Sequence, residues 1–275
     1  MIDAKDEAGL IPLQLAVASP WPRLVDALLN RGPDLGSTGF AFPTESDFDE
    51  IAKPRVGEAS YHFKQRVASG LLLVLELLEK RGYRASRSDA LTIMRLFDKW
   101  QLFKKSSRST FVDDCFVNAR GIVEELSIPR EHWYDDEDVV IVARSLKMNP
   151  SLSLYELVHL PAEEATRLIA CKDYHEFWRS GDLRKLPYGS REDCAVHLCE
   201  KLSRGFFRRW ALEHCRDDIV PENLNNEDLW RVCLGPRVVK PLAQSNGVGK
   251  RKRATNVVIK WERPKKRSMK VPKII

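Results

Sequence analysis

The sequence predicts an all-α protein, and three observations support this prediction. Most apolar clusters of the 275-residue chain have the i, i+3, i+4 spacing of an amphipathic helix. Strand-like runs are short, as in residues 257–259 (VVI). Helix-capping signals precede apolar runs, as in Ser153 followed three residues later by Glu156. We therefore expect helical hairpins in the N-terminal part, a compact helical module after them, and a disordered basic tail.

Residues 6–35 predict the first pair of helices. Gly9 suits a tight turn, and Pro12 fits the first helical position, where its missing N–H costs nothing. Gly32 can adopt the left-handed conformation that ends a helix. The apolar residues expected to face the core are Leu13, Leu15 and Ala16 in the first helix and Val25, Leu28 and Leu29 in the second.

This segment, DEAGLIPLQLAVASPWPRLVDALLNRGPDL, resembles one ankyrin repeat, a helix–turn–helix unit that stacks on its neighbours and binds other proteins. The copy is degenerate, because Ile11 and Gln14 replace the Thr and His of the usual T-P-L-H motif, whose side chains tie the turn by hydrogen bonds. An ordinary helical hairpin is the alternative. A single repeat cannot bury its apolar face, so we expect it to pack on the next part of the chain or to end a longer array. The motif positions are Gly9, Pro12, Leu13, Ala16, Leu28, Leu29 and Gly32.

A weaker second unit comes after a long connection. Residues 71–82 (LLLVLELLEKRG) resemble the second helix of such a repeat, with Gly82 as its stop, and Ser88 is expected to cap the next helix. Residues 36–61 between the units have no clear period and predict a connection. Residues 1–105 thus form the expected degenerate ankyrin-repeat region. The connection is expected to be held by Phe40, Phe42 and Phe48, and the last helix to be lined by Ala90, Ile93, Met94, Phe97 and Trp100.

Two further regions are predicted to be helical. Residues 106–150 form an expected connecting helical segment, in which the acidic run 135–138 begins an apolar helix and complements its dipole. Residues 151–235 form an expected compact helical domain, whose longest helix opens at Ser190 and whose shorter helices begin at Ser153 and Pro161 or end at Gly181. One face of the longest helix carries Ala195, Leu198, Leu202, Phe206 and Trp210, and another carries Lys201, Arg204 and Arg208.

Three segments of this domain resemble the PRANC module, the F-box-like C-terminal domain of ankyrin-repeat proteins known from poxviruses and parasitic wasps. They are 151–160 (SLSLYELVHL), 194–212 (CAVHLCEKLSRGFFRRWAL) and 224–234 (LNNEDLWRVCL). The order of an ankyrin part and then a PRANC part is also that of the family. The resemblance implies that the module recruits the Skp-type adaptor of a cullin-type (SCF) ubiquitin ligase, while the ankyrin part chooses the target. The adaptor-binding positions that it implies are Leu224, Leu229, Val232, Cys233 and Leu234.

The chain departs from the F-box pattern before the NEDL segment. An F-box starts with a Leu-Pro step and a full helix, whereas only residues 215–223 (CRDDIVPEN) are available here. At about 25 cal/mol per Å², losing a few hundred Å² of apolar contact weakens recruitment by orders of magnitude. The alternative is that residues 224–234 simply close the helical core.

The net charge of +6 divides unevenly along the chain. Residues 237–275 hold 13 Lys and Arg and one acid, so they carry +12 and the other residues carry −6. This tail, within residues 236–275, resembles a bipartite nuclear-import signal; a phosphate-backbone contact and an inert solvated tail are the alternatives. Nucleic-acid binding is not expected, except through this tail. The two basic clusters contain Lys252 and Arg253, and Lys265, Lys266 and Arg267.

The remaining patterns indicate an intracellular protein, cytoplasmic or nuclear, without membrane segments. No apolar run approaches 18 residues, and the six cysteines lack the spacing of a disulfide scaffold. The sequence has no P-loop, G-x-G-x-x-G, G-x-S-x-G or H-E-x-x-H motif, so we expect neither an enzyme nor a cofactor. Cys194, His197 and Cys199 are the best metal candidates, but their spacing does not put them on one helix face, so no metal is expected.

These patterns favour a protein–protein interaction module. The first hypothesis is a substrate adaptor that links a target protein to a cullin-type ubiquitin ligase. The alternative is an ankyrin-type binding or inhibitory protein, nuclear in one version, with no link to ubiquitin.

Overall fold

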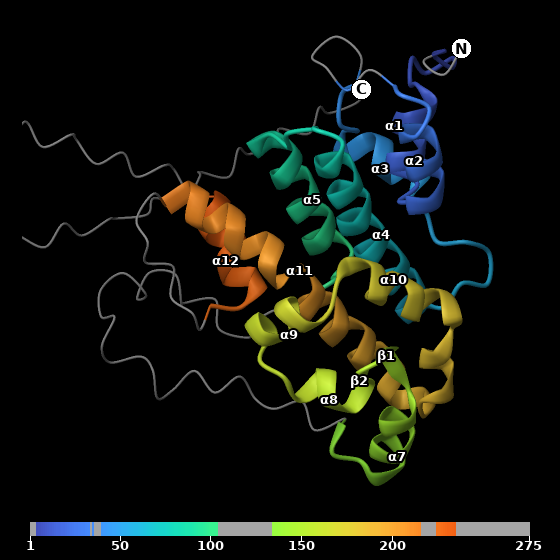
Figure 1. Cartoon of the computed structure of the whole chain (residues 1–275), viewed down its shortest axis with the longest axis vertical. Helices are drawn as coiled ribbons and strands as arrows, with labels where there is room; N and C mark the ends of the chain where they lie inside the picture. The colour runs from blue at the N-terminus through green and yellow to red at the C-terminus, as the bar shows by residue number, and fades with distance from the viewer. Residues whose placement is uncertain (1–3, 34, 36–39, 104–133, 216–223, 235–275) are drawn as a thin grey trace, which may run out of the picture.

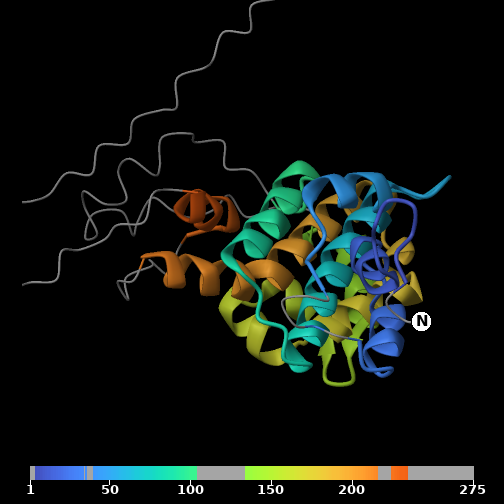
Figure 2. The same ribbon diagram turned by 90° about the horizontal axis from the view of Figure 1, so that it is seen from above.

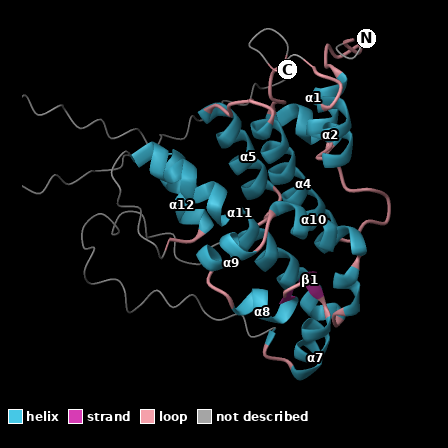
Figure 3. Cartoon of the chain, viewed as in Figure 1, coloured by secondary structure: helices cyan, strands magenta, loops and turns pink. Residues whose placement is uncertain are grey.

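The computed structural model describes residues 4–33, 35, 40–103, 134–215 and 224–234, and these residues are mainly helical (Figures 1 and 3). The predicted helical class is therefore confirmed. The N-terminal helices are α1 (Pro12–Ala18), α2 (Pro22–Leu29), α3 (Glu45–Ile51), α4 (Ser60–Lys80) and α5 (Arg87–Lys99). The later helices are α7 (Glu137–Ser145), α8 (Leu154–His159), α9 (Ala162–Leu168), α10 (Cys171–Ser180), α11 (Arg191–Cys215) and α12 (Asn226–Leu234), with 3-10 turns η2 (Asp182–Lys185) and η3 (Tyr188–Ser190).

A small β-hairpin interrupts the helices. Strands β1 (Lys147–Asn149) and β2 (Leu152–Ser153) pair antiparallel, with Asn149 opposite Leu152. The Asn149 side-chain oxygen accepts a hydrogen bond from the Ser151 backbone N–H at 3.0 Å, which closes the turn between the strands. These strands are too short to show the alternation of apolar and polar residues from which a β-strand is predicted.

Helix α4 lies at the centre of the molecule. It contacts α2 of the N-terminal hairpin, and it also contacts α10 and α11 (Figures 1 and 2). Its residues from Val67 to Leu75 are all at most 9% exposed. One hydrophobic cluster therefore runs from Ile11 to Cys233, and the expected N-terminal and C-terminal regions share it.

The close approach of the α1–α2 turn to α4 depends on a glycine. A Cβ atom at Gly70 would lie 2.6 Å from the carbonyl oxygen of Pro20 and 2.8 Å from its Cβ. Real Cβ atoms do not approach other atoms so closely, so any side chain at this position would push the hairpin away from α4.

Helix α11 is buried on more than one side, which corrects the predicted pattern. Leu198 and Leu202 are buried as expected, but Phe207, on a different face, packs edge-on against Phe97 and Phe103 with ring centroids 5.7 and 5.6 Å apart. Lys201 and Arg204, which the pattern placed on a polar face, are each only 7% exposed. Neighbours from α4, α9 and α12 cover these side chains, and helical periodicity cannot reveal them.

Local signals set most helix ends where they were predicted. Ser153 and Glu156 form a reciprocal capping box at α8, and Gly181 ends α10 with φ = 69°. The prediction for Ser88 is wrong: Ser86 caps α5 with Asp89, and Ser88 lies inside the helix. The connection 36–61 also contains the unpredicted helix α3, which Thr44 caps.

The three phenylalanines expected to hold this connection do so. Phe40 and Phe48 are at most 6% exposed, and Phe42 packs beside Phe48 and Tyr83. Among the described residues, none of the helices combines the length and the apolar character needed to cross a bilayer.

Candidate protein-binding surfaces

The ankyrin-like motif residues of the N-terminus form one tight hairpin. Gly9 and Gly32 have φ values of 81° and 72°, which explains glycine at both turns. Pro12 opens α1 at its first position. The four apolar motif residues, all at most 9% exposed, are Leu13, Ala16, Leu28 and Leu29.

Gln14 makes the hydrogen bonds that hold this turn. Its Oε1 accepts from the Ile11 backbone N–H at 2.9 Å, and its Nε2 donates to the Ala41 carbonyl at 3.0 Å. The departure from the T-P-L-H motif therefore leaves the turn tied, and it adds a bond to the segment before α3.

The outer face of α2 carries two exposed apolar side chains. Trp21, directly before the helix, is 55% exposed, and Leu24, one turn later, is 39% exposed. Both lie off the buried stripe of Val25, Leu28 and Leu29. An exposed tryptophan beside an exposed leucine is the kind of surface on which binding energy concentrates. This pair was not predicted from the sequence, although its position off the buried stripe was a readable signal.

The second ankyrin-like unit is not a copy of the first. Helix α4 begins at Ser60, well before the predicted start at residue 71, and has 21 residues against 8 in α2. Gly82 still follows it with φ = 91°. A helix of this length, covered on several sides, is the centre of the core and not an exposed repeat.

Most of the F-box-like positions are in the core. Leu224, Leu229 and Cys233 are at most 5% exposed, because α12 packs on α11 and α5. Val232 is half-buried, and Leu234 is 51% exposed at the end of the helix. The burial of three of these five side chains matches the alternative in which residues 224–234 close the helical core.

Polar contacts also fix α12 to its neighbours. Asn226 Nδ2 donates to the Glu200 carbonyl at 2.9 Å and to Ser203 Oγ at 2.8 Å. An Arg204 guanidinium N–H donates to the Leu224 carbonyl, and Arg87 donates to the Cys233 carbonyl at 3.0 Å. The bond from Arg204 thus gives this buried charge of α11 a structural role.

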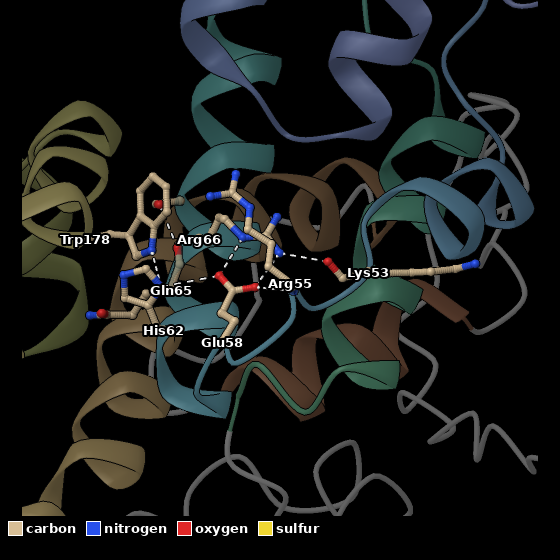
Figure 4. Close-up of polar contacts among 8 residues, drawn as sticks. Lys53, Arg55, Glu58, His62, Gln65, Arg66 and Trp178 are labelled. Atoms are coloured by element: carbon tan, nitrogen blue, oxygen red, sulfur yellow. Dashed lines mark hydrogen bonds and ion pairs between the residues drawn. The ribbon is translucent and has the colours of Figure 1, made fainter. Parts of the chain in front are cut away.

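A buried ion pair organises the interface between α4 and the segment before it (Figure 4). Arg66 donates from Nε and from an Nη atom to the two carboxylate oxygens of Glu58, each at 2.8 Å, and both side chains are at most 6% exposed. Arg66 also donates to the Lys53 carbonyl, and Glu58 accepts from the Arg55 backbone N–H. Burial opposes the charge on Glu58, but these hydrogen bonds outweigh it and lower its pKa to about 2.

Two histidines line the neighbouring contact between α4 and α10. The Trp178 indole N–H donates to His62 Nδ1 at 3.3 Å. His175 is 6% exposed and lies 3.3 Å from Ser69 Oγ. Burial, together with the charges of Arg179 and Arg23, lowers the pKa of His175 to about 4. These groups join helices α4 and α10.

The metal candidates have other surroundings. Cys194 and Cys199 are buried and free of disulfides, and His197 Nε2 lies 3.2 Å from the Val158 carbonyl oxygen. Within the described ranges, no three His, Cys, Asp or Glu side chains cluster as a metal site would require. Burial raises the pKa of Cys199 to about 12, so its thiol is protonated.

Two remaining predictions concern charged segments. Asp136 caps α7 by accepting from the backbone N–H groups of Asp138 and Val139, so the acidic run has the helix-starting role predicted for it. The nuclear-import candidates lie outside the described residues. They are Lys252, Arg253, Lys265, Lys266 and Arg267.

No protein-family model, no curated protein and no solved structure matches this chain.

Proposed function

We propose that this chain is a non-enzymatic protein-binding module that holds its partner on the outer face of the α1–α2 hairpin. The observation that carries the proposal is that the apolar pair Trp21 and Leu24 is exposed, off the buried stripe of α2. The resemblance of the hairpin to an ankyrin repeat, a unit that binds proteins, points in the same direction. In this proposal the protein acts inside the cell, in the cytoplasm or the nucleus.

The hairpin is suited to this role because it is held rigidly. Its inner face packs on α4, Gln14 ties its first turn, and the Arg81 guanidinium donates to the Asn30 side chain at the end of α2. A fixed surface loses little entropy when a partner binds, so two apolar side chains can contribute most of the affinity.

The test is quantitative co-purification of the full chain from insect-cell lysate. Trp21→Ser/Leu24→Ser removes the apolar pair, and Ile141→Ser is the matched control, because Ile141 is a 64% exposed apolar residue on α7. We expect one set of proteins to be retained by the wild type and the control and lost with the double variant. Equal recovery with all three chains refutes the proposal.

A second candidate function is the substrate adaptor of a cullin-type ubiquitin ligase. The observation that favours it is Leu234, the F-box-like position left 51% exposed at the end of α12. Skp-type adaptor and cullin should co-purify with the wild type and be lost with Leu234→Asp, which leaves the core unchanged. Absence of both from the wild-type fraction leaves an ankyrin-type binding or inhibitory protein with no ubiquitin link.

Nuclear import through the basic tail is part of the proposal of a binding or inhibitory protein with no ubiquitin link. A fluorescent protein fused to residues 236–275 should enter the nucleus, and replacing Lys265, Lys266 and Arg267 by alanine should prevent this. Cytoplasmic fluorescence from the unchanged fusion would contradict it.

A further inference from the structure

A cleft of about 320 Å³ opens between α4, the start of α10, α9 and α11, which meet near the middle of the molecule (Figure 1). This volume lies within the range of small-molecule pockets, about 300–1,000 Å³. The helices around it are far apart in the sequence, α4 in the N-terminal half and α9, α10 and α11 in the C-terminal half, and none of the surfaces discussed above includes the cleft.

The floor of the cleft is apolar. Leu72 and Leu75 from α4, Ile169 before α10 and Leu202 from α11 line it, and each is at most 8% exposed. Such a floor has the character of a hydrocarbon-binding surface.

Lys201 and Tyr174 are two of the polar side chains that line the cleft, and both have unused hydrogen-bonding capacity, although the Tyr174 hydroxyl oxygen is itself buried. Lys201 is 7% exposed and donates to the Leu160 carbonyl, which leaves two of the three ammonium donors. Burial lowers its pKa to about 8, so it is still mainly charged at pH 7. Tyr174 is 6% exposed, and among the described residues its hydroxyl has no hydrogen-bond partner. Burial raises the pKa of Tyr174, so it remains a phenol that can donate.

The charges at the rim are already paired. Arg209 on α11 bonds to Glu79 on α4 with its closer nitrogen at 3.0 Å, and Lys80 bonds to Glu76 at 2.7 Å. Within the described residues, the direct contact of the Lys201 ammonium is the bond to the Leu160 carbonyl. The Lys201 ammonium therefore has no carboxylate of these residues in direct contact, although the charges of Glu200 and Glu163 raise its pKa and partly oppose the effect of burial.

We propose that this cleft binds a small amphiphilic carboxylate. Its carboxylate group accepts a hydrogen bond from the Lys201 ammonium, and its hydrocarbon part lies on Leu72, Leu75 and Leu202. A single interior cation matches a monoanion, whereas the carboxylates of the rim oppose a dianion such as a phosphate monoester. A neutral ligand would lack the charge-assisted hydrogen bond that a carboxylate accepts from this ammonium.

The test uses decanoate as the probe and the purified full chain at pH 7, with binding measured by calorimetry. Decanol has the same hydrocarbon chain without the charge. Because hydrogen bonds to a charged group contribute more than neutral ones, we expect decanoate to bind about tenfold or more tightly than decanol. No binding of decanoate, or equal affinity for the two probes, overturns the proposal.

Two variants place the binding in this cleft. Lys201→Met should abolish the preference for decanoate over decanol, whereas Lys172→Met, at an exposed lysine of α10 outside the cleft, should preserve it. Gly205→Leu fills the mouth of the cleft and should abolish binding of both probes. The fold tolerates a Cβ atom there, since it meets only Thr166 Cγ2 at 3.5 Å and Thr166 Cβ at 3.9 Å. If Lys201→Met does not fold, Gly205→Leu still tests the proposal: wild-type affinity of Gly205→Leu for decanoate overturns it.

Discussion

Removal of the buried Glu58 carboxylate should destabilise the whole fold. In Glu58→Gln the Arg66 guanidinium keeps its charge, at 6% side-chain exposure, but loses its anionic partner. Breaking a buried ion pair from one side costs about 3–5 kcal/mol. The pKa of Glu58 gives a similar magnitude: a fall from 4.5 to about 2 corresponds to roughly 3 kcal/mol in favour of the folded state.

The assay is thermal unfolding followed by circular dichroism, with urea unfolding at 25 °C as a second measurement. For a domain of this size, about 3 kcal/mol lowers the Tm by roughly 6–12 °C. Glu76→Gln is the matched control, because its ion pair with Lys80 is exposed and such pairs contribute about 0–1 kcal/mol. A Glu58→Met/Arg66→Met variant should lose less stability than Glu58→Gln, since no unpaired charge remains.

The pH dependence provides a further check. A carboxyl with a depressed folded pKa stabilises the fold above its unfolded pKa of about 4.5, and this contribution disappears as the pH falls through the folded pKa. The stability difference between wild type and Glu58→Gln should thus be constant above about pH 5 and shrink between about pH 4.5 and 2. A difference below about 1 kcal/mol at pH 7 would mean that the buried pair does not stabilise the fold in this way.

Three further predictions concern the core. Gly70→Ala should lower the free energy of urea unfolding by about 1–3 kcal/mol, because its methyl group collides with the Pro20 carbonyl. The free energy of unfolding of the wild type should fall by roughly 3 kcal/mol between pH 6.5 and 4, because His175 is protonated at a higher pH in the unfolded chain than in the folded one. His175→Asn should show a smaller fall when urea titrations are repeated across this pH range. Leu229→Ala should cost about 2–5 kcal/mol and Leu234→Ala less than about 0.5 in the same urea titration, because only the first is buried.

Each of these predictions has a control and an outcome that contradicts it. Gly189→Ala adds its methyl group to open space and should be neutral, so a loss as large as that of Gly70→Ala would remove the argument from close approach. His159→Asn, at an exposed position, should keep the wild-type slope with pH. Equal losses at Leu229 and Leu234 would mean that α12 does not close the core.

Local sequence predicts most of the helices and many of their ends, but not α3 or the start of α4. Ser153 with Glu156, Gly181 and Pro12 act through bonds and dihedral angles within a few residues, so short-range chemistry reveals them. The sequence already favours Ser86 over Ser88 as the cap, because Asp89 stands three residues after Ser86, whereas Leu91 stands three residues after Ser88.

The contacts of each helix face, in contrast, depend on how the helices pack. The periodicity of α11 marks one apolar face, but segments far away in the sequence cover Lys201 and Arg204. Neither the Glu58–Arg66 pair nor the cleft beside Lys201 and Tyr174 has a sequence signature, because the sequence does not distinguish a buried charged residue from a solvent-exposed one. Burial depends on contacts distant in sequence, and these form only when α4, α10, α11 and α12 pack around one core.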